Sequence, residues 1–153
     1  LISEEQGRHK STFCRMLMPP QLARYYSDNL KLTAQGNPER LLAEMGLLNM
    51  DEFDKFGAQK MPLLKNLMQM SSLNICKAYQ KNFRSLPRIA SFIGTSNRTD
   101  LLCDPTGSRR FICIEAEHDI DCTGIEHSQI YAQLKEELLA GARHWFNKEE
   151  EHA

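Results

Sequence analysis

Short apolar runs alternate with helical periodicities along the chain. Residues 47–50 and 89–97 are mostly apolar and end in polar side chains, which is typical of buried strands. Apolar residues at helical spacing, with prolines or glycines near several of the ends, predict helices. These helices cover residues 11–18, 38–45, 61–70 and about 125–146, with Asn37 as the cap of the second, Gly46 as its end and Gly141 as a break in the last.

The remaining segments complete an alternating order of strands and helices. Residues 1–3 resemble the end of a strand, 25–28 a short strand, 74–88 a hairpin or extended loop, and 110–115 an alternating strand. Such an order predicts a three-layer α/β fold with a mostly parallel sheet. No repeat or linker divides it, so we expect one domain over residues 1–153. The missing initiator Met and the short first strand indicate a fragment whose first strand is truncated.

The composition excludes several classes of protein but does not indicate a function. The 153 residues are 41% hydrophobic and 25% charged, which excludes collagen-like and disordered chains. No apolar run approaches the roughly 18–20 residues that cross a bilayer, and no stretch of the given sequence resembles a signal peptide. The five cysteines form no metal-ligand spacing and are interpreted as reduced thiols, mostly core fillers, in a cytoplasmic protein.

The net charge of −1 hides an uneven distribution. Residues 55–110 hold ten Lys or Arg against two acids, a charge of +8, and the rest of the chain carries −9. One interpretation is a face that meets a polyanion, and the other is two parts that neutralise each other.

A candidate phosphate-binding loop lies between the first strand and the first helix. Gly7, Lys10, Ser11 and Thr12 stand there. Backbone N–H groups and a lysine suit phosphates, and a Ser or Thr hydroxyl suits Mg²⁺. The match to G-x-x-x-x-G-K-[ST] is partial because Glu4 and His9 replace the two glycines, so a chance match is the alternative.

Two further polar groups follow predicted buried strands. Asp51 could anchor Mg²⁺ and Glu52 could orient an attacking water, whereas Asn97 could contact a phosphate or that water. A solvated acidic turn and a turn cap are the respective alternatives. In this order and spacing, the three groups have the layout of additional-strand nucleoside triphosphatases.

Basic residues offer two further candidate contacts. Arg109 and Arg110 follow a turn and could stabilise a transferring phosphoryl group from a neighbouring subunit, or could form surface salt bridges. Cations interleaved with rings suit a nucleic-acid strand, with a solvated basic loop as the alternative. This second set comprises Lys77, Tyr79, Lys81, Arg84 and Arg88, with Phe83 among them.

Four stretches together resemble a known family. They are G-T-S-N at 94–97, D-P-T-G-S-R-R-F at 104–111, K-S-T-F at 10–13 and N-M-D-E-F at 49–53. With them the chain resembles the virulence-associated protein E-like family, P-loop ATPase domains of bacterial mobile elements that are related to superfamily-three helicases. The resemblance covers nearly the whole chain, including a closing helix near residues 137–145.

The resemblance implies a P-loop ATPase of the additional-strand (AAA+) type that uses ATP and Mg²⁺ in mobile-element replication. It implies Lys10 and Ser11 as phosphate and Mg²⁺ contacts, Asp51 and Glu52 as the acidic pair, and Asn97 as the sensor. It also implies an intersubunit arginine at 109 or 110, a DNA-contacting hairpin at 74–88, an oligomeric ring and an associated primase. The alternative, suggested by Glu4 and His9, is a domain that binds DNA or protein without hydrolysis.

Overall fold

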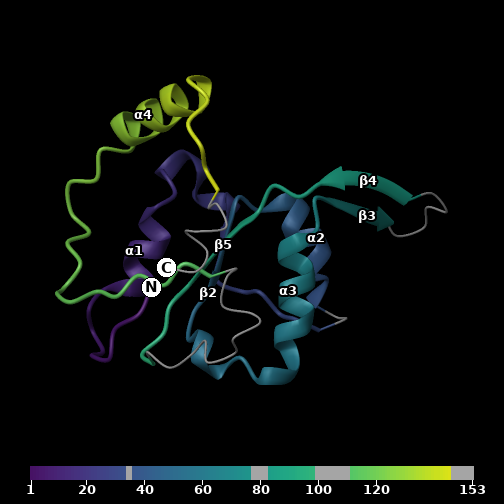
Figure 1. Ribbon diagram of the computed structural model, residues 1–153, viewed down its shortest axis with the longest axis horizontal. Coiled ribbons are helices and arrows are strands. Elements are labelled where there is room, and N and C mark those ends of the chain that lie inside the picture. Colours follow the sequence, from purple (N-terminus) through teal and green to yellow (C-terminus); the bar gives the residue numbers. More distant parts are fainter. Residues whose placement is uncertain (34–35, 77–82, 99–110, 146–153) are drawn as a thin grey trace.

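A parallel sheet lies at the centre of the fold (Figure 1). The computed structural model describes residues 1–33, 36–76, 83–98 and 111–145. The strand order is β1 (Tyr26–Ser27), β2 (Leu47–Met50) and β5 (Ser91–Gly94), and all pairings are parallel. The prediction of an α/β fold with a mostly parallel sheet is therefore confirmed.

The sheet continues beyond β5 through a single residue. Ile2 forms parallel bridges with Ser96 on one side and Glu115 on the other. The segment that leads into the candidate phosphate-binding loop thus lies between the β5 segment and residue 115. Because all of these strands run in the same direction, the polar residues after them meet at one edge of the sheet.

Helices lie on both sides of β2, and an apolar core joins two of them to it. The helices are α1 (Lys10–Met16), α2 (Pro38–Glu44), α3 (Met61–Gln69) and α4 (His127–Leu139). In the view of Figure 1, α1 lies on one side of β2 and β5, and α2 and α3 lie on the other. Leu42, Leu48, Leu64 and Leu67 belong to one apolar core that joins α2, β2 and α3, and each is at most 1% exposed.

Of the two alternatives predicted for residues 74–88, a hairpin or an extended loop, the structure shows the paired strands of a hairpin. β3 (Ser72–Cys76) and β4 (Phe83–Pro87) pair antiparallel, with Ser72 opposite Pro87 and Cys76 opposite Phe83. The hairpin extends away from the central sheet in Figure 1. Arg88 joins it to the body, because its guanidinium donates to the carbonyls of Met70, 2.7 Å away, and Ala90, 2.6 Å away.

Several predicted boundaries were wrong. Residues 111–114 form no strand, because the neighbouring segment pairs only through Ile2, whose partner is Glu115. Ile112 and Ile114 are exposed. Asn37 is the N-cap of α2 as predicted, but its backbone is left-handed and its side chain makes no capping hydrogen bond. Gly46 does not end α2. Its amide instead donates to the carbonyl of Tyr25 and joins β1 to β2.

The last helix is shorter and more exposed than its pattern predicts. Within α4 no residue is buried, and Leu138 and Leu139 are largely exposed. His127 and Tyr131 hold it to the end of α1 through the carbonyls of Met16 and Leu17. In the described part of the chain, no helix is long and apolar enough to cross a membrane.

The cysteines only partly fill the core. Cys14 on α1 is fully buried, and its burial raises the pKa of its thiol to about 11. Cys113 is exposed and Cys122 is half-buried, so the prediction of core positions holds for one of these three. Cys76 and Cys103 have no described side chains.

Candidate functional site

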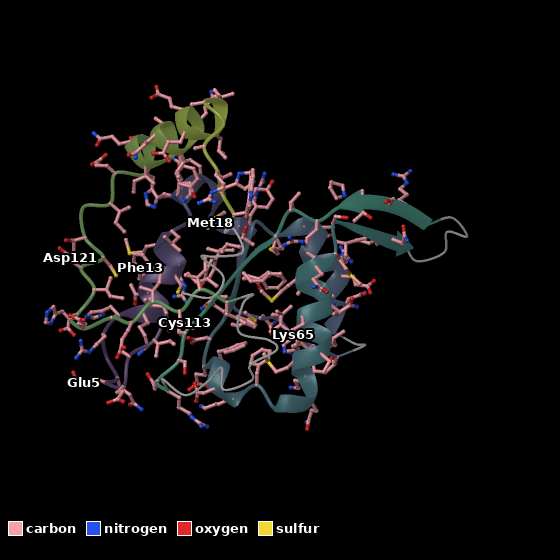
Figure 2. All side chains as sticks on the ribbon, viewed as in Figure 1. Glu5, Phe13, Met18, Lys65, Cys113 and Asp121 are labelled. Carbon is pink, nitrogen blue, oxygen red and sulfur yellow. The ribbon has the colours of Figure 1, made fainter. Side chains whose placement is uncertain are left out.

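A cavity of about 400 Å³ opens at the carboxyl edge of the sheet. Its size falls within the range of about 300–1,000 Å³ that is usual for small-molecule sites. Polar side chains and backbone from three segments line it: residues 6–12, the pair Asp51–Glu52 after β2, and residues 95–97 after β5. In Figure 2, Glu5 marks the loop that leads into α1, and Phe13 marks α1 itself.

Lys10 is the buried cation of this cavity. The residue is 7% exposed, and its ammonium donates to Ser3 Oγ at 2.5 Å and Asn97 Oδ1 at 2.8 Å. It also lies 3.3 Å from the carbonyl oxygens of Ser3 and Glu5. Burial, and then the nearby Arg8, lower the pKa of Lys10. A desolvated ammonium beside a polar cavity is suited to an anionic ligand.

A pair of oxygen ligands lies beside Lys10. Ser11 Oγ donates to Asp51 Oδ1 at 2.7 Å, and the hydroxyl of Thr95 donates to the same carboxylate oxygen. Hard cations such as Mg²⁺ prefer hydroxyl and carboxylate oxygens, with water or phosphate completing the shell. Among the described residues no cluster of three or more His, Cys, Asp or Glu forms a metal cage. Ser11 and Asp51 therefore fit a cation that is shared with a ligand.

Glu52 lies at the rim of the cavity with an unusual backbone conformation. Its φ of 52° is left-handed, its amide donates to Thr95 Oγ1 at 3.3 Å, and its carboxylate pairs with Lys55 at 2.6 Å. The Glu52 side chain is 56% exposed, so it remains accessible to water.

The backbone of the loop before α1 is left-handed at two residues. Gly7 has φ 87° and His9 has φ 59°, so His9 adopts the left-handed conformation that glycine adopts freely. A left-handed non-glycine residue costs roughly 1–2 kcal/mol, although histidine tolerates it better than most. Arg8 neutralises Glu5 at 2.8 Å and also donates to the carbonyl of Ala116.

The structure brings most of the predicted pocket residues together. Gly7, Lys10, Ser11, Thr12, Asp51, Glu52 and Asn97 all line the cavity. The predicted residues Arg109, Arg110, Lys77, Tyr79 and Lys81 lie outside the described residues. Arg84 is exposed on β4, whereas Arg88 is held by the backbone carbonyls described above.

Sequence reasoning missed two residues that organise the site. Ser3 is 2% exposed and accepts a hydrogen bond from Lys10, and Thr95 is 4% exposed and contacts the acidic pair. Both are small hydroxyl residues at the carboxyl end of a strand segment. That position was the available signal, since a hydroxyl there reaches the neighbouring strand end.

Comparison with known proteins gives a family. No curated protein matches the chain with significant similarity. The family model described as the virulence-associated protein E-like domain matches residues 1–153, the whole sequence. The chain therefore belongs to the virulence-associated protein E-like family.

Proposed function

We propose that this domain binds ATP with Mg²⁺ and hydrolyses it as a replication-type ATPase of a mobile genetic element. The observation that carries the proposal is the buried ammonium of Lys10 beside the Ser11–Asp51 pair in one cavity. An ammonium in a desolvated position compensates phosphate charge more strongly than one in water. The resemblance to P-loop ATPases supports the same assignment.

The chain supplies the remaining roles from neighbouring strand ends. Lys10 holds phosphate oxygens, and Ser11 and Asp51 hold the Mg²⁺, which neutralises charge on the transferring group when it is bound. Glu52 orients the attacking water and Asn97 contacts the phosphate end. Arg109 or Arg110 of an adjacent copy completes the site in an oligomeric ring. The order of the sheet supports the roles of Lys10 and Asn97. Residues 1–3, which lead into the loop before Lys10, lie beside the β5 segment that ends in Asn97.

The second candidate function is a domain that binds DNA or protein without hydrolysis. The ammonium of Lys10 favours this alternative, because protein oxygens from Ser3, Glu5 and Asn97 already surround it. A nucleotide must compete with these contacts. In addition, His9 holds its left-handed conformation at a cost in free energy.

A nucleotide titration separates these candidates. We expect micromolar binding of Mg–ATP by calorimetry, much weaker binding of ATP in the presence of EDTA, and hydrolysis by the same preparation. At a ligand concentration of about 100 times Kd, the free energy of unfolding should rise by about 2.7 kcal/mol. If neither heat nor thermal stabilisation accompanies Mg–ATP, the ATPase proposal fails and the non-hydrolysing alternative holds.

The proposed DNA contact is the β3–β4 hairpin. It extends from the body, and Arg84 is exposed on it. Because each phosphate contact adds about −0.9 to the slope of log affinity against log salt, Lys81→Ala with Arg84→Ala should make the slope shallower by about 2. Binding of a fluorescent oligonucleotide at several salt concentrations measures this slope.

The control for that measurement removes the same charge elsewhere. Lys135→Ala with Arg143→Ala removes one charge on α4, which lies apart from the hairpin in Figure 1, and one charge four residues after α4. This variant should leave the slope unchanged. Equal slopes in wild type and the hairpin variant would show that the hairpin charges face solvent.

A further inference from the structure

We propose that Thr95 is the positioning residue that sets the geometry of both acids, Asp51 and Glu52. This inference rests on the proposed ATPase function, for which those two acids hold the cation and orient the water. Thr95 follows β5 directly, whereas the acids follow β2, so the hydroxyl acts across the gap between two strand ends.

The side chain of Thr95 uses both hydrogen-bonding capacities of its hydroxyl. Its Oγ1 donates to Asp51 Oδ1 and accepts from the Glu52 amide at 3.3 Å. A hydroxyl has one donor and two acceptor lone pairs, so one atom can serve both acids at once.

The backbone of Thr95 reinforces the same contact. Its amide donates to the carbonyl of Met50 at 3.2 Å, and its carbonyl accepts from the amide of Phe53 at 2.8 Å. Side chain and backbone together bind four consecutive residues, 50–53. Because Thr95 is only 4% exposed, water cannot readily replace its hydroxyl.

These contacts fix the features that the reaction requires. Ser11 and Thr95 donate to the same oxygen of Asp51, which sets the rotation of the carboxylate toward the cation site. The bond to the Glu52 amide holds the backbone where φ turns positive, a conformation that surrounding contacts must maintain. Threonine also suits the role because its branched Cβ restricts χ1, so the hydroxyl is held in place before a ligand binds.

The test compares Thr95→Val, which keeps the shape and removes the hydroxyl, with Thr95→Ser, which keeps the hydroxyl. Thr33→Val is the matched control, because Thr33 is exposed and its hydroxyl accepts from the amide of Gly36. If Thr95→Val does not fold, Thr95→Ala provides the same loss of the hydroxyl.

Two measurements are made on each variant. The first is amide hydrogen exchange at Glu52 without nucleotide, which should be roughly 5- to 10-fold faster in Thr95→Val, as the loss of one hydrogen bond implies. The second is the Mg²⁺ concentration for half-maximal ATP hydrolysis together with kcat. We expect the Mg²⁺ requirement to rise roughly tenfold and kcat to fall in Thr95→Val. In Thr95→Ser and Thr33→Val both values should stay within about twofold of wild type.

The outcomes distinguish this inference from the proposed function. Faster exchange at Glu52 with a raised Mg²⁺ requirement, both rescued by serine, supports the positioning role. Unchanged exchange or an unchanged Mg²⁺ requirement in Thr95→Val, in a wild type that hydrolyses ATP, overturns it. If wild type binds no nucleotide, the ATPase proposal fails, and the exchange rate alone decides whether Thr95 holds the acidic pair.

Discussion

Replacing Lys10 by methionine is expected to lower the affinity for Mg–ATP roughly 100-fold and to weaken the fold only modestly. Hydrogen bonds to charged groups contribute up to about 3 kcal/mol, which corresponds to roughly 100-fold in affinity. Methionine fills a similar volume and carries no charge. Because methionine leaves the buried oxygens of Ser3 without the donor that Lys10 supplies, we expect the free energy of unfolding to fall by roughly 1–3 kcal/mol.

The direction of the Lys10 pKa shift sets a pH dependence. Because burial lowers the pKa of Lys10 from its usual 10.5, the folded state releases this proton more readily than the unfolded state. The buried ammonium therefore costs stability below the folded-state pKa, and this cost disappears as pH rises from that value toward 10.5. Phosphate binding needs the protonated form, so nucleotide affinity should decline over the same alkaline range.

Calorimetry measures the Mg–ATP affinity of Lys10→Met, and denaturant unfolding measures its stability. Lys135→Met is the matched control, because Lys135 is exposed on α4 and should affect neither quantity. Wild-type affinity in Lys10→Met would remove Lys10 from the site. Loss of binding together with a large loss of stability would instead show a structural role.

Replacing Glu52 by glutamine should reduce ATP hydrolysis roughly 100-fold or more and leave Mg–ATP affinity nearly unchanged. A residue that orients and deprotonates water contributes about 10²- to 10⁴-fold in rate. Glutamine keeps the length and can still approach Lys55, which pairs with Glu52 at 2.6 Å. The backbone bond from the Glu52 amide to Thr95 is retained in this variant.

The control for Glu52 is a second carboxylate close by. Asp54 accepts a hydrogen bond from Ser96 at 3.3 Å and does not line the cavity, so Asp54→Asn should change the rate by less than about threefold. A steady-state assay of ATP hydrolysis by wild type and both variants measures this difference in rate. If Glu52→Gln hydrolyses ATP as fast as wild type, water activation belongs to another group.

The pattern of strands and helices was predictable because it depends on local periodicity. β2 over Leu47–Met50 has the bounds that its apolar run predicts, and α3 differs from the expected range by one residue. The clustering of Lys10, Asp51 and Asn97 was also predictable. Residues at the carboxyl ends of parallel strands meet at one edge of the sheet whatever the details of packing.

Contacts between distant segments could not be read from the sequence. The roles of Ser3 and Thr95 depend on which strand end lies opposite each of them. The sequence does not distinguish these hydroxyls from the other hydroxyls in the same polar clusters. The alternation in residues 110–115 suggests a strand, but a strand also needs a partner, and Ile2 offers pairing at Glu115 alone. The exposure of α4 likewise depends on tertiary contacts, because its apolar spacing is that of a packed helix.

The anchoring of Arg88 has a mechanical consequence. The hairpin and the cavity lie at opposite ends of one stretch of chain, which runs from β4 through Arg88 into β5 and on to Thr95 and Asn97. Arg88 donates to the carbonyls of Met70 and Ala90, and Ala90 directly precedes β5. A displacement of the hairpin would therefore act on the first residues of β5. Strand β5, which is paired with β2, therefore connects the base of the hairpin directly to the residues that line the cavity.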